Sequence, residues 1–172
     1  MGSCGVTERE SDYGLDLLGM VVDQKLKEID FEYFNLPEIK EFLKQAILDE
    51  IRQTNCGCSQ EELDCYIAVM FPPRYESAII LVAECLVDYL TAGKLTVDLY
   101  DRVKHQLYPK EVKTFQYTQT DLKILLDELR QILDPQSASS QSWKGSAYKG
   151  NWEAHIQSLC TAIQLQIGGE AK

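Results

Sequence analysis

The sequence predicts an all-α fold, and three observations carry that prediction. Apolar residues recur at three- and four-residue spacings along most of the chain, which is the period of an amphipathic helix. Several of these segments begin with a helix-capping residue and end near glycine or proline. No segment shows the sustained two-residue alternation that is typical of a half-buried strand. The pattern therefore indicates a single compact irregular bundle of about seven helices.

Stacked helix pairs in a solenoid-like array are the alternative architecture. Residues 87–90 (VDYL) resemble residues 126–129 (LDEL), and the spacing of 39 residues is near that of some helical repeats. Amphipathic helices share short matches of this kind by chance, so the compact bundle is preferred.

The first expected helix covers residues 12–30, where five large aliphatic residues follow one stripe. A second begins after Asn35, because an N-cap residue, an early proline and Glu38 three positions on form a helix start. Its apolar stripe continues until Thr54.

Ser59 and Glu62 form a capping box that opens a short third helix. Pro72–Pro73 is expected to break that helix, because proline lacks the donor that a helix interior needs. Residues 75–90 are apolar on nearly all sides, which predicts a fourth helix enclosed by other helices. Gly93 suits its C-terminal cap.

The second half of the chain has less regular patterns. A fifth helix is expected from Thr96 to Pro109, followed by an extended linker at residues 112–117. Thr118 and Asp121 then resemble the start of a sixth helix, which carries a leucine-rich stripe.

The end of the chain combines a loop with one more helix. Residues 135–150 are rich in serine and glycine and are expected to form a loop, after which Asn151 caps the last helix. The domain is expected to span residues 12–167, with flexible termini at 1–11 and 168–172.

Composition excludes several classes of function. The 172 residues suit one domain, and 17 basic against 27 acidic residues give a net charge of −10. This balance argues against binding to nucleic acid or to anionic membranes, both of which require clustered cations. Residues 1–70 hold 15 of the acidic and 6 of the basic residues, so the first half of the chain is the acidic half.

Cysteine usage and the start of the chain bear on location. Six cysteines could form disulfides, but no apolar secretory segment precedes them, so we expect a reducing cytosolic or nuclear compartment. Alternatively, the first four residues resemble an acylation signal, with Gly2 and Cys4 as the acylated residues. Acylation there would attach the protein to a membrane. The expected serine or threonine at the sixth position is Val6, which weakens that match.

Residues with catalytic or metal-binding potential do not form a recognised set. Cys56, Cys58 and Cys65 approach a zinc cluster, but their spacing is wrong and no fourth ligand is nearby in the sequence. His105 and His155 lie in amphipathic segments without a nucleophile beside them, which indicates solvated or boundary histidines. We therefore expect no catalytic residues, metal or cofactor.

The preferred function is a non-enzymatic protein-interaction domain, an adaptor or complex subunit, whose acidic half binds a basic segment of a partner protein. Exposed aromatic side chains among carboxylates suit such a partner. The expected partner-binding residues are Glu28, Asp30, Glu32, Tyr33, Phe34, Glu38 and Glu41. An expected secondary surface consists of Trp143, Tyr148 and Trp152.

Two other classes of function stay open. The excess of large aliphatic residues at 78–87 could enclose an apolar or lipid ligand within the bundle. An enzyme whose site is dispersed over several helices would also leave no local motif in the sequence.

Overall fold

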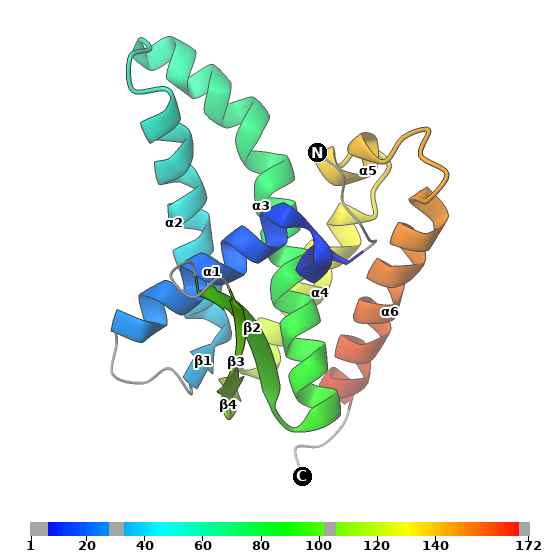
Figure 1. The fold of residues 1–172 in the computed structure, drawn as a ribbon. Coiled ribbons are helices and arrows are strands. Elements are labelled where there is room, and N and C mark those ends of the chain that lie inside the picture. Colours follow the sequence, from blue (N-terminus) through cyan, green and yellow to red (C-terminus); the bar gives the residue numbers. More distant parts are fainter. Residues whose placement is uncertain (1–6, 28–32, 102–105, 169–172) are drawn as a thin grey trace.

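The computed structural model describes residues 7–27, 33–101 and 106–168, and its helices dominate the fold as predicted (Figure 1). The described helices are the 3₁₀ turn η1 (Glu8–Glu10), α1 (Asp12–Lys27), α2 (Leu36–Thr54), α3 (Gln60–Ala92), α4 (Gln119–Ile132), α5 (Ala138–Ser142) and α6 (Lys149–Gly168). The described strands are β1 (Tyr33–Asn35), β2 (Leu95–Asp101), β3 (Gln106–Val112) and β4 (Thr114–Gln116).

Helix α3 is the centre of the fold. Its residues 78–86 are all buried, and α1, α2, α4, α5 and α6 each contact it. Leu86 is 0 % exposed. The prediction that this apolar segment is enclosed by other helices is therefore confirmed.

Three of the predicted helix starts are confirmed in detail, at Asn35, Ser59 and Thr118. The Asn35 side chain accepts a hydrogen bond from the Glu38 N–H at 3.2 Å, which caps α2. Reciprocal capping boxes form at the starts of α3 and α4, between Ser59 and Glu62 and between Thr118 and Asp121. These local bonds satisfy N–H groups that a helix start leaves unpaired.

The expected break at Pro72–Pro73 is wrong, because α3 runs through both prolines as one helix of 33 residues. Proline removes a backbone hydrogen bond and usually ends or kinks a helix. Here Phe71 and Tyr75 stack across the prolines with ring centroids 5.2 Å apart, and Arg74 pairs with Glu50 of α2 at 2.8 Å. Packing along α2 therefore keeps the helix continuous where local propensity opposes it.

The expected helix at residues 96–109 is also wrong, because this segment forms an antiparallel hairpin of β2 and β3. Leu95 and Val97 are buried while Thr96 between them is exposed, which is the two-residue period of a strand. Pro109 lies opposite Asp98 in this two-stranded sheet. A proline is tolerated there because both strands are edge strands.

The expected extended linker contains β4, which pairs in parallel with β1 in a second two-stranded sheet. Residues 135–150 are not wholly a loop, since α5 forms at Ala138–Ser142. Helix α6 begins at Lys149 rather than after Asn151, and the Trp152 N–H bonds to the Tyr148 carbonyl at 3.0 Å.

The pair α2–α3 extends beyond the rest of the molecule. Figure 1 shows its upper half rising clear of the other helices, whereas its lower half lies in the bundle. No helix in the described parts of the chain has both the length and the apolar composition that a membrane span requires.

Candidate protein-binding site

The expected acidic site is not assembled as one exposed surface in the described residues. Phe34 is 2 % exposed, and its ring meets Phe115 edge-on at 5.8 Å. The expectation that the Phe34 ring is exposed is therefore wrong, because pairing of β1 with β4 places the ring in the core. Tyr33 is partly buried, and its hydroxyl donates a hydrogen bond to Gln116.

Of the five acidic residues expected around those aromatic rings, two are exposed on α2 and three lie outside the described residues. Glu38 and Glu41 are exposed on α2, and Glu41 lies 3.9 Å from the Lys44 ammonium. The other three expected carboxylates lie outside the described residues; they are Glu28, Asp30 and Glu32.

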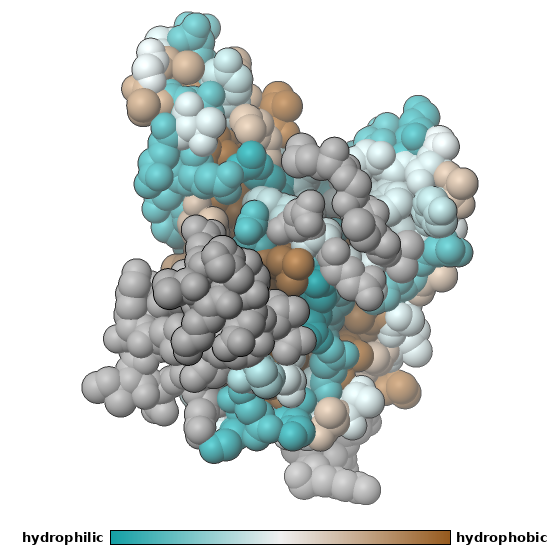
Figure 2. Space-filling view, viewed as in Figure 1, coloured by the Kyte–Doolittle hydropathy of each residue, from teal (hydrophilic) through white to brown (hydrophobic). Residues whose placement is uncertain are grey.

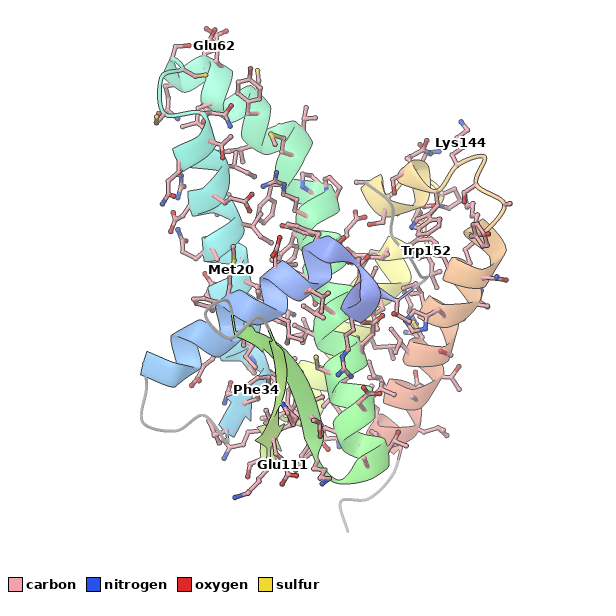
Figure 3. The ribbon with its side chains drawn as sticks, in the orientation of Figure 1. Met20, Phe34, Glu62, Glu111, Lys144 and Trp152 are labelled. Atoms are coloured by element: carbon pink, nitrogen blue, oxygen red, sulfur yellow. The ribbon has the colours of Figure 1, made fainter. Side chains whose placement is uncertain are left out.

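The expected secondary surface is mainly internal. Trp152 is 1 % exposed, so the expectation that its ring lies on the surface is wrong. Trp143 stacks on it with ring centroids 6.0 Å apart, which packs the segment before α6 against the bundle (Figure 3). Tyr148 alone of the three is well exposed, at 63 %.

The described residues present a different acidic and apolar surface at the end of the α2–α3 pair. We call residues 56–73 the hairpin tip. The chain turns there through a hydrogen bond from the Cys58 N–H to the Asn55 carbonyl, at 3.1 Å. Glu62, in the first turn of α3, lies at the far end of the hairpin (Figure 3).

One side of α3 in the hairpin tip carries apolar side chains that face solvent. Val69 is 74 % exposed and Tyr66 is 43 % exposed. We call the exposed residues of this side the apolar stripe: Cys65, Tyr66, Ala68, Val69 and Pro72. Figure 2 shows hydrophobic atoms at the surface of this upper part of the hairpin. Contiguous exposed apolar surface of this kind is a mark of an interaction site.

The stripe exists because residues 65–73 of α3 are uncharged while several of them remain exposed to solvent. The sequence from Cys65 to Pro73 contains no charged residue. Ile67 and Met70 face inward and pack against the hydrophobic core. A helix that is apolar on every side needs neighbours on every side, and the residues of the apolar stripe stay exposed on the outer side of the hairpin tip.

Carboxylates surround the end of the stripe. Glu61, Glu62 and Asp64 are exposed, and no basic residue occurs between Arg52 and Arg74 in the sequence. Hydrogen bonds from the Ser59 N–H and hydroxyl lower the pKa of Glu62, so its charge persists at neutral pH.

The two flanking arginines do not neutralise this charge. Arg52 pairs with Asp49 at 3.1 Å, and Arg74 pairs with Glu50 at 2.8 Å. Each cation is therefore already matched by a carboxylate of α2. The hairpin tip keeps its three negative charges beside an exposed apolar surface.

A pocket lies between α2 and α4, and the charged side chains that line it balance one another. The pocket, of about 210 Å³, is lined by Lys40, Lys44, Glu41 and Asp121 together with Tyr75 and Ile124. Lys40 pairs with Glu128, and Lys44 approaches Glu41 at 3.9 Å. Compared with the hairpin tip, this pocket offers no net charge to select a partner.

A buried polar cluster on α3 was not expected from the sequence. Glu84 is 5 % exposed, and His155 of α6 lies with its Nε2 2.7 Å from the Glu84 Oε1. The same carboxylate accepts hydrogen bonds from the Glu8 and Arg9 N–H groups, both at 2.9 Å. A signal was present: Glu84 is the only charged residue between Glu76 and Asp88, and a buried lone charge requires partners.

The described residues hold neither a cluster of metal ligands nor a large pocket at the Leu18–Phe34–Leu81 position in the core. No three histidine, cysteine or carboxylate side chains among them converge to hold a metal ion. Cys56, Cys58 and Cys65 are free thiols at the hairpin tip. A core pocket lined by Leu18, Phe34, Leu81 and other apolar residues measures about 10 Å³, which is too small for an acyl chain.

The chain was compared with protein-family models, with curated proteins and with solved structures, and none of the three comparisons finds a match. The hairpin tip is therefore assigned from its own geometry and charge.

Proposed function

We propose that the protein is a non-enzymatic interaction domain that binds a basic amphipathic helix of a partner protein along the hairpin tip. The observation that carries this proposal is the apolar stripe, in which Val69 is 74 % exposed. Covering a side chain of this size contributes roughly 1.5–3 kcal/mol. A partner that covers the stripe gains this energy with few polar groups to desolvate.

The spacing of the stripe favours a helix as the covering element. Cys65, Val69 and Pro72 follow one another at intervals of four and three residues, so they form a ridge along α3. Ridges of this kind pack into the grooves of a neighbouring helix. A partner helix would lie on the opposite side of α3 from α2 and would complete a three-helix arrangement.

The charges select a basic partner. Glu61, Glu62 and Asp64 would face lysine or arginine side chains at the rim of such a complex. Rim charges mainly accelerate encounter and exclude acidic competitors, whereas the apolar contacts hold the complex. In this proposal the acidic half of the chain binds the partner through α3 rather than through residues 28–41.

Free thiols at the hairpin tip suit a reducing compartment, so we place the protein in the cytosol or nucleus. In that setting Cys65 would contribute to the stripe as a small apolar side chain.

Two charge-reversal variants test where the basic partner binds. One changes Glu61→Lys and Asp64→Lys in the hairpin tip; the other changes Glu38→Lys and Glu41→Lys on the originally expected surface. Both variants have the same net charge, so a difference between them reports location. The probe is a synthetic amphipathic helix of leucine and lysine, and its affinity is measured by isothermal titration calorimetry.

The hairpin-tip variant should bind the probe about tenfold more weakly than the α2 variant, which corresponds to about 1.4 kcal/mol. Wild-type affinity should also fall as salt rises past about 0.1 M. A greater loss of affinity in the α2 variant would show that the probe binds at the surface expected from the sequence, and this would contradict a site at the hairpin tip. Equal loss in both variants would show attraction to net charge alone, which contradicts a defined site.

A further inference from the structure

A short N-terminal turn is attached to the centre of the fold by one carboxylate. Figure 1 shows the beginning of the described chain lying against α3, and η1 contacts both α3 and α1. Both oxygens of Glu84 are used: Oε1 accepts from the Glu8 N–H and Oε2 from the Arg9 N–H, each at 2.9 Å. Glu84 therefore caps η1 from a different element of the structure.

Further contacts fix the same turn. The Arg9 guanidinium pairs with Asp88 of α3 and donates to the Thr96 carbonyl at 3.0 Å. The Gly14 backbone packs so closely that a Cβ atom there would lie 1.8 Å from the Glu8 carbonyl oxygen. Any side chain at position 14 is thus incompatible with the docked turn.

The docked turn brings a second carboxyl group toward Glu84. The Glu8 carboxyl accepts a hydrogen bond from the Ser11 hydroxyl at 3.1 Å and is partly buried. The groups that face it are Glu84 and Ser77 of α3, His155 of α6, and Tyr13 of α1. Burial, reinforced by the charge of Glu84, raises the pKa of Glu8 to about 7, although Ser11, Ser77 and His155 act in the opposite direction.

We propose that Glu8, beside the Glu84–His155 pair, acts as a pH-dependent latch, which holds the N-terminal turn against α3 in acid and releases it as the pH rises to neutral and above. A protonated Glu8 adds no charge beside the ionised Glu84. An ionised Glu8 places two negative charges in one desolvated site, and undocking the turn lets the second charge return to water.

The direction follows from proton linkage. A released Glu8 has its ordinary pKa of 4.5, whereas the docked group has a pKa of about 7. Docking therefore retains its full advantage below pH 4.5 and loses it as the pH rises through about 7. Each unit of pKa difference changes the docking equilibrium about tenfold.

The first test follows Glu8 and its neighbour in the intact wild-type protein by NMR. The carbon-13 shift of the Glu8 carboxyl should titrate with a midpoint near pH 7. Hydrogen-exchange protection of the Glu8 and Arg9 amides, corrected for intrinsic exchange, should fall at least about tenfold between pH about 5.5 and about 8.5. A midpoint near 4.5, or constant protection, would overturn the latch.

Variants separate the latch from general loosening of the protein. Glu8→Gln keeps the shape of the protonated group and should hold both amides protected across the same pH range. Gly14→Ala should expose them at every pH, because its methyl group excludes the docked turn. Glu153→Gln, which removes a charge elsewhere on α6, should retain the wild-type pH response. A Glu8→Gln protein with the wild-type pH response would contradict the role of Glu8.

Discussion

Glu84 and His155 lie 71 residues apart in the chain, and their side chains meet at 2.7 Å, which joins the buried centre of α3 to α6. The same carboxylate holds two N–H groups of η1. One side chain thus connects three segments that are distant in sequence. Its removal has consequences that can be measured.

Glu84→Ala should lower the free energy of unfolding by about 3 kcal/mol, because two backbone N–H groups and an imidazole lose their buried acceptor. Urea denaturation followed by circular dichroism measures the change. Glu153→Ala, which removes a carboxylate 3.7 Å from Lys149 on the surface of α6, should cost less than about 0.5 kcal/mol. Equal losses in the two variants would show that the Glu84 cluster has no special structural role.

Truncation of the core of α3 gives a second prediction about stability. Leu86 is 0 % exposed, and Leu86→Ala should cost roughly 2–5 kcal/mol through lost burial and a residual cavity. Leu165 on α6 is 70 % exposed, so Leu165→Ala should change stability by less than about 0.5 kcal/mol. A small effect of Leu86→Ala, measured by the same denaturation, would mean that α3 is not the centre of the core.

Replacing a proline inside α3 should increase the free energy of unfolding, whereas the preceding variants should lower it. Pro72→Ala restores an N–H group to the helix and should raise the free energy of unfolding by about 1 kcal/mol, part of the gain being offset by a more flexible unfolded chain. Because Pro72 is exposed, the change leaves the core packing intact. Destabilisation by more than about 1 kcal/mol would indicate instead that α3 needs proline at this position.

Thiol chemistry distinguishes the hairpin tip from the core. Burial raises the pKa of Cys85 to about 12, whereas Cys56 and Cys65 are exposed. In native protein near pH 8, alkylation of Cys85 should be at least about 100-fold slower than alkylation of Cys56 and Cys65, as followed by peptide mass spectrometry. In urea the rates should converge. Rapid native labelling of Cys85 would contradict its enclosure by the surrounding helices.

Helix starts were predictable because their chemistry is local. Asn35, Ser59 and Thr118 each bond to a group three residues later, and the printed sequence contains both partners of every bond. The enclosure of α3 was predictable for a similar reason, since an apolar run such as residues 78–83 leaves no polar face for solvent.

Strand pairing was not predictable in the same way. Residues 95–112 satisfy a helical spacing through Val97 and Tyr100, yet they form a hairpin because Leu95 pairs with Val112 and buries one face. Phe34 became a core residue through its contact with Phe115, which is 81 positions away in the chain. Both outcomes depend on non-local partners that a local pattern does not contain.

The binding surface was predicted only in part. The acidic half of the chain was apparent from composition, but the exposure of Val69 depends on α3 continuing through Pro72–Pro73 and extending beyond the bundle. The apolar stripe is exposed because α3 continues through Pro72–Pro73, where the local sequence pattern predicts a break.

The most direct test of the account compares Val69→Glu with Leu165→Glu for binding of the leucine–lysine helix. Val69 and Leu165 are 74 % and 70 % exposed, so both variants should fold, and each adds one negative charge. If the apolar stripe is the docking surface, Val69→Glu should weaken binding at least about tenfold, while Leu165→Glu should leave it unchanged or slightly stronger. Equal affinity of the two variants for the helix would contradict the account.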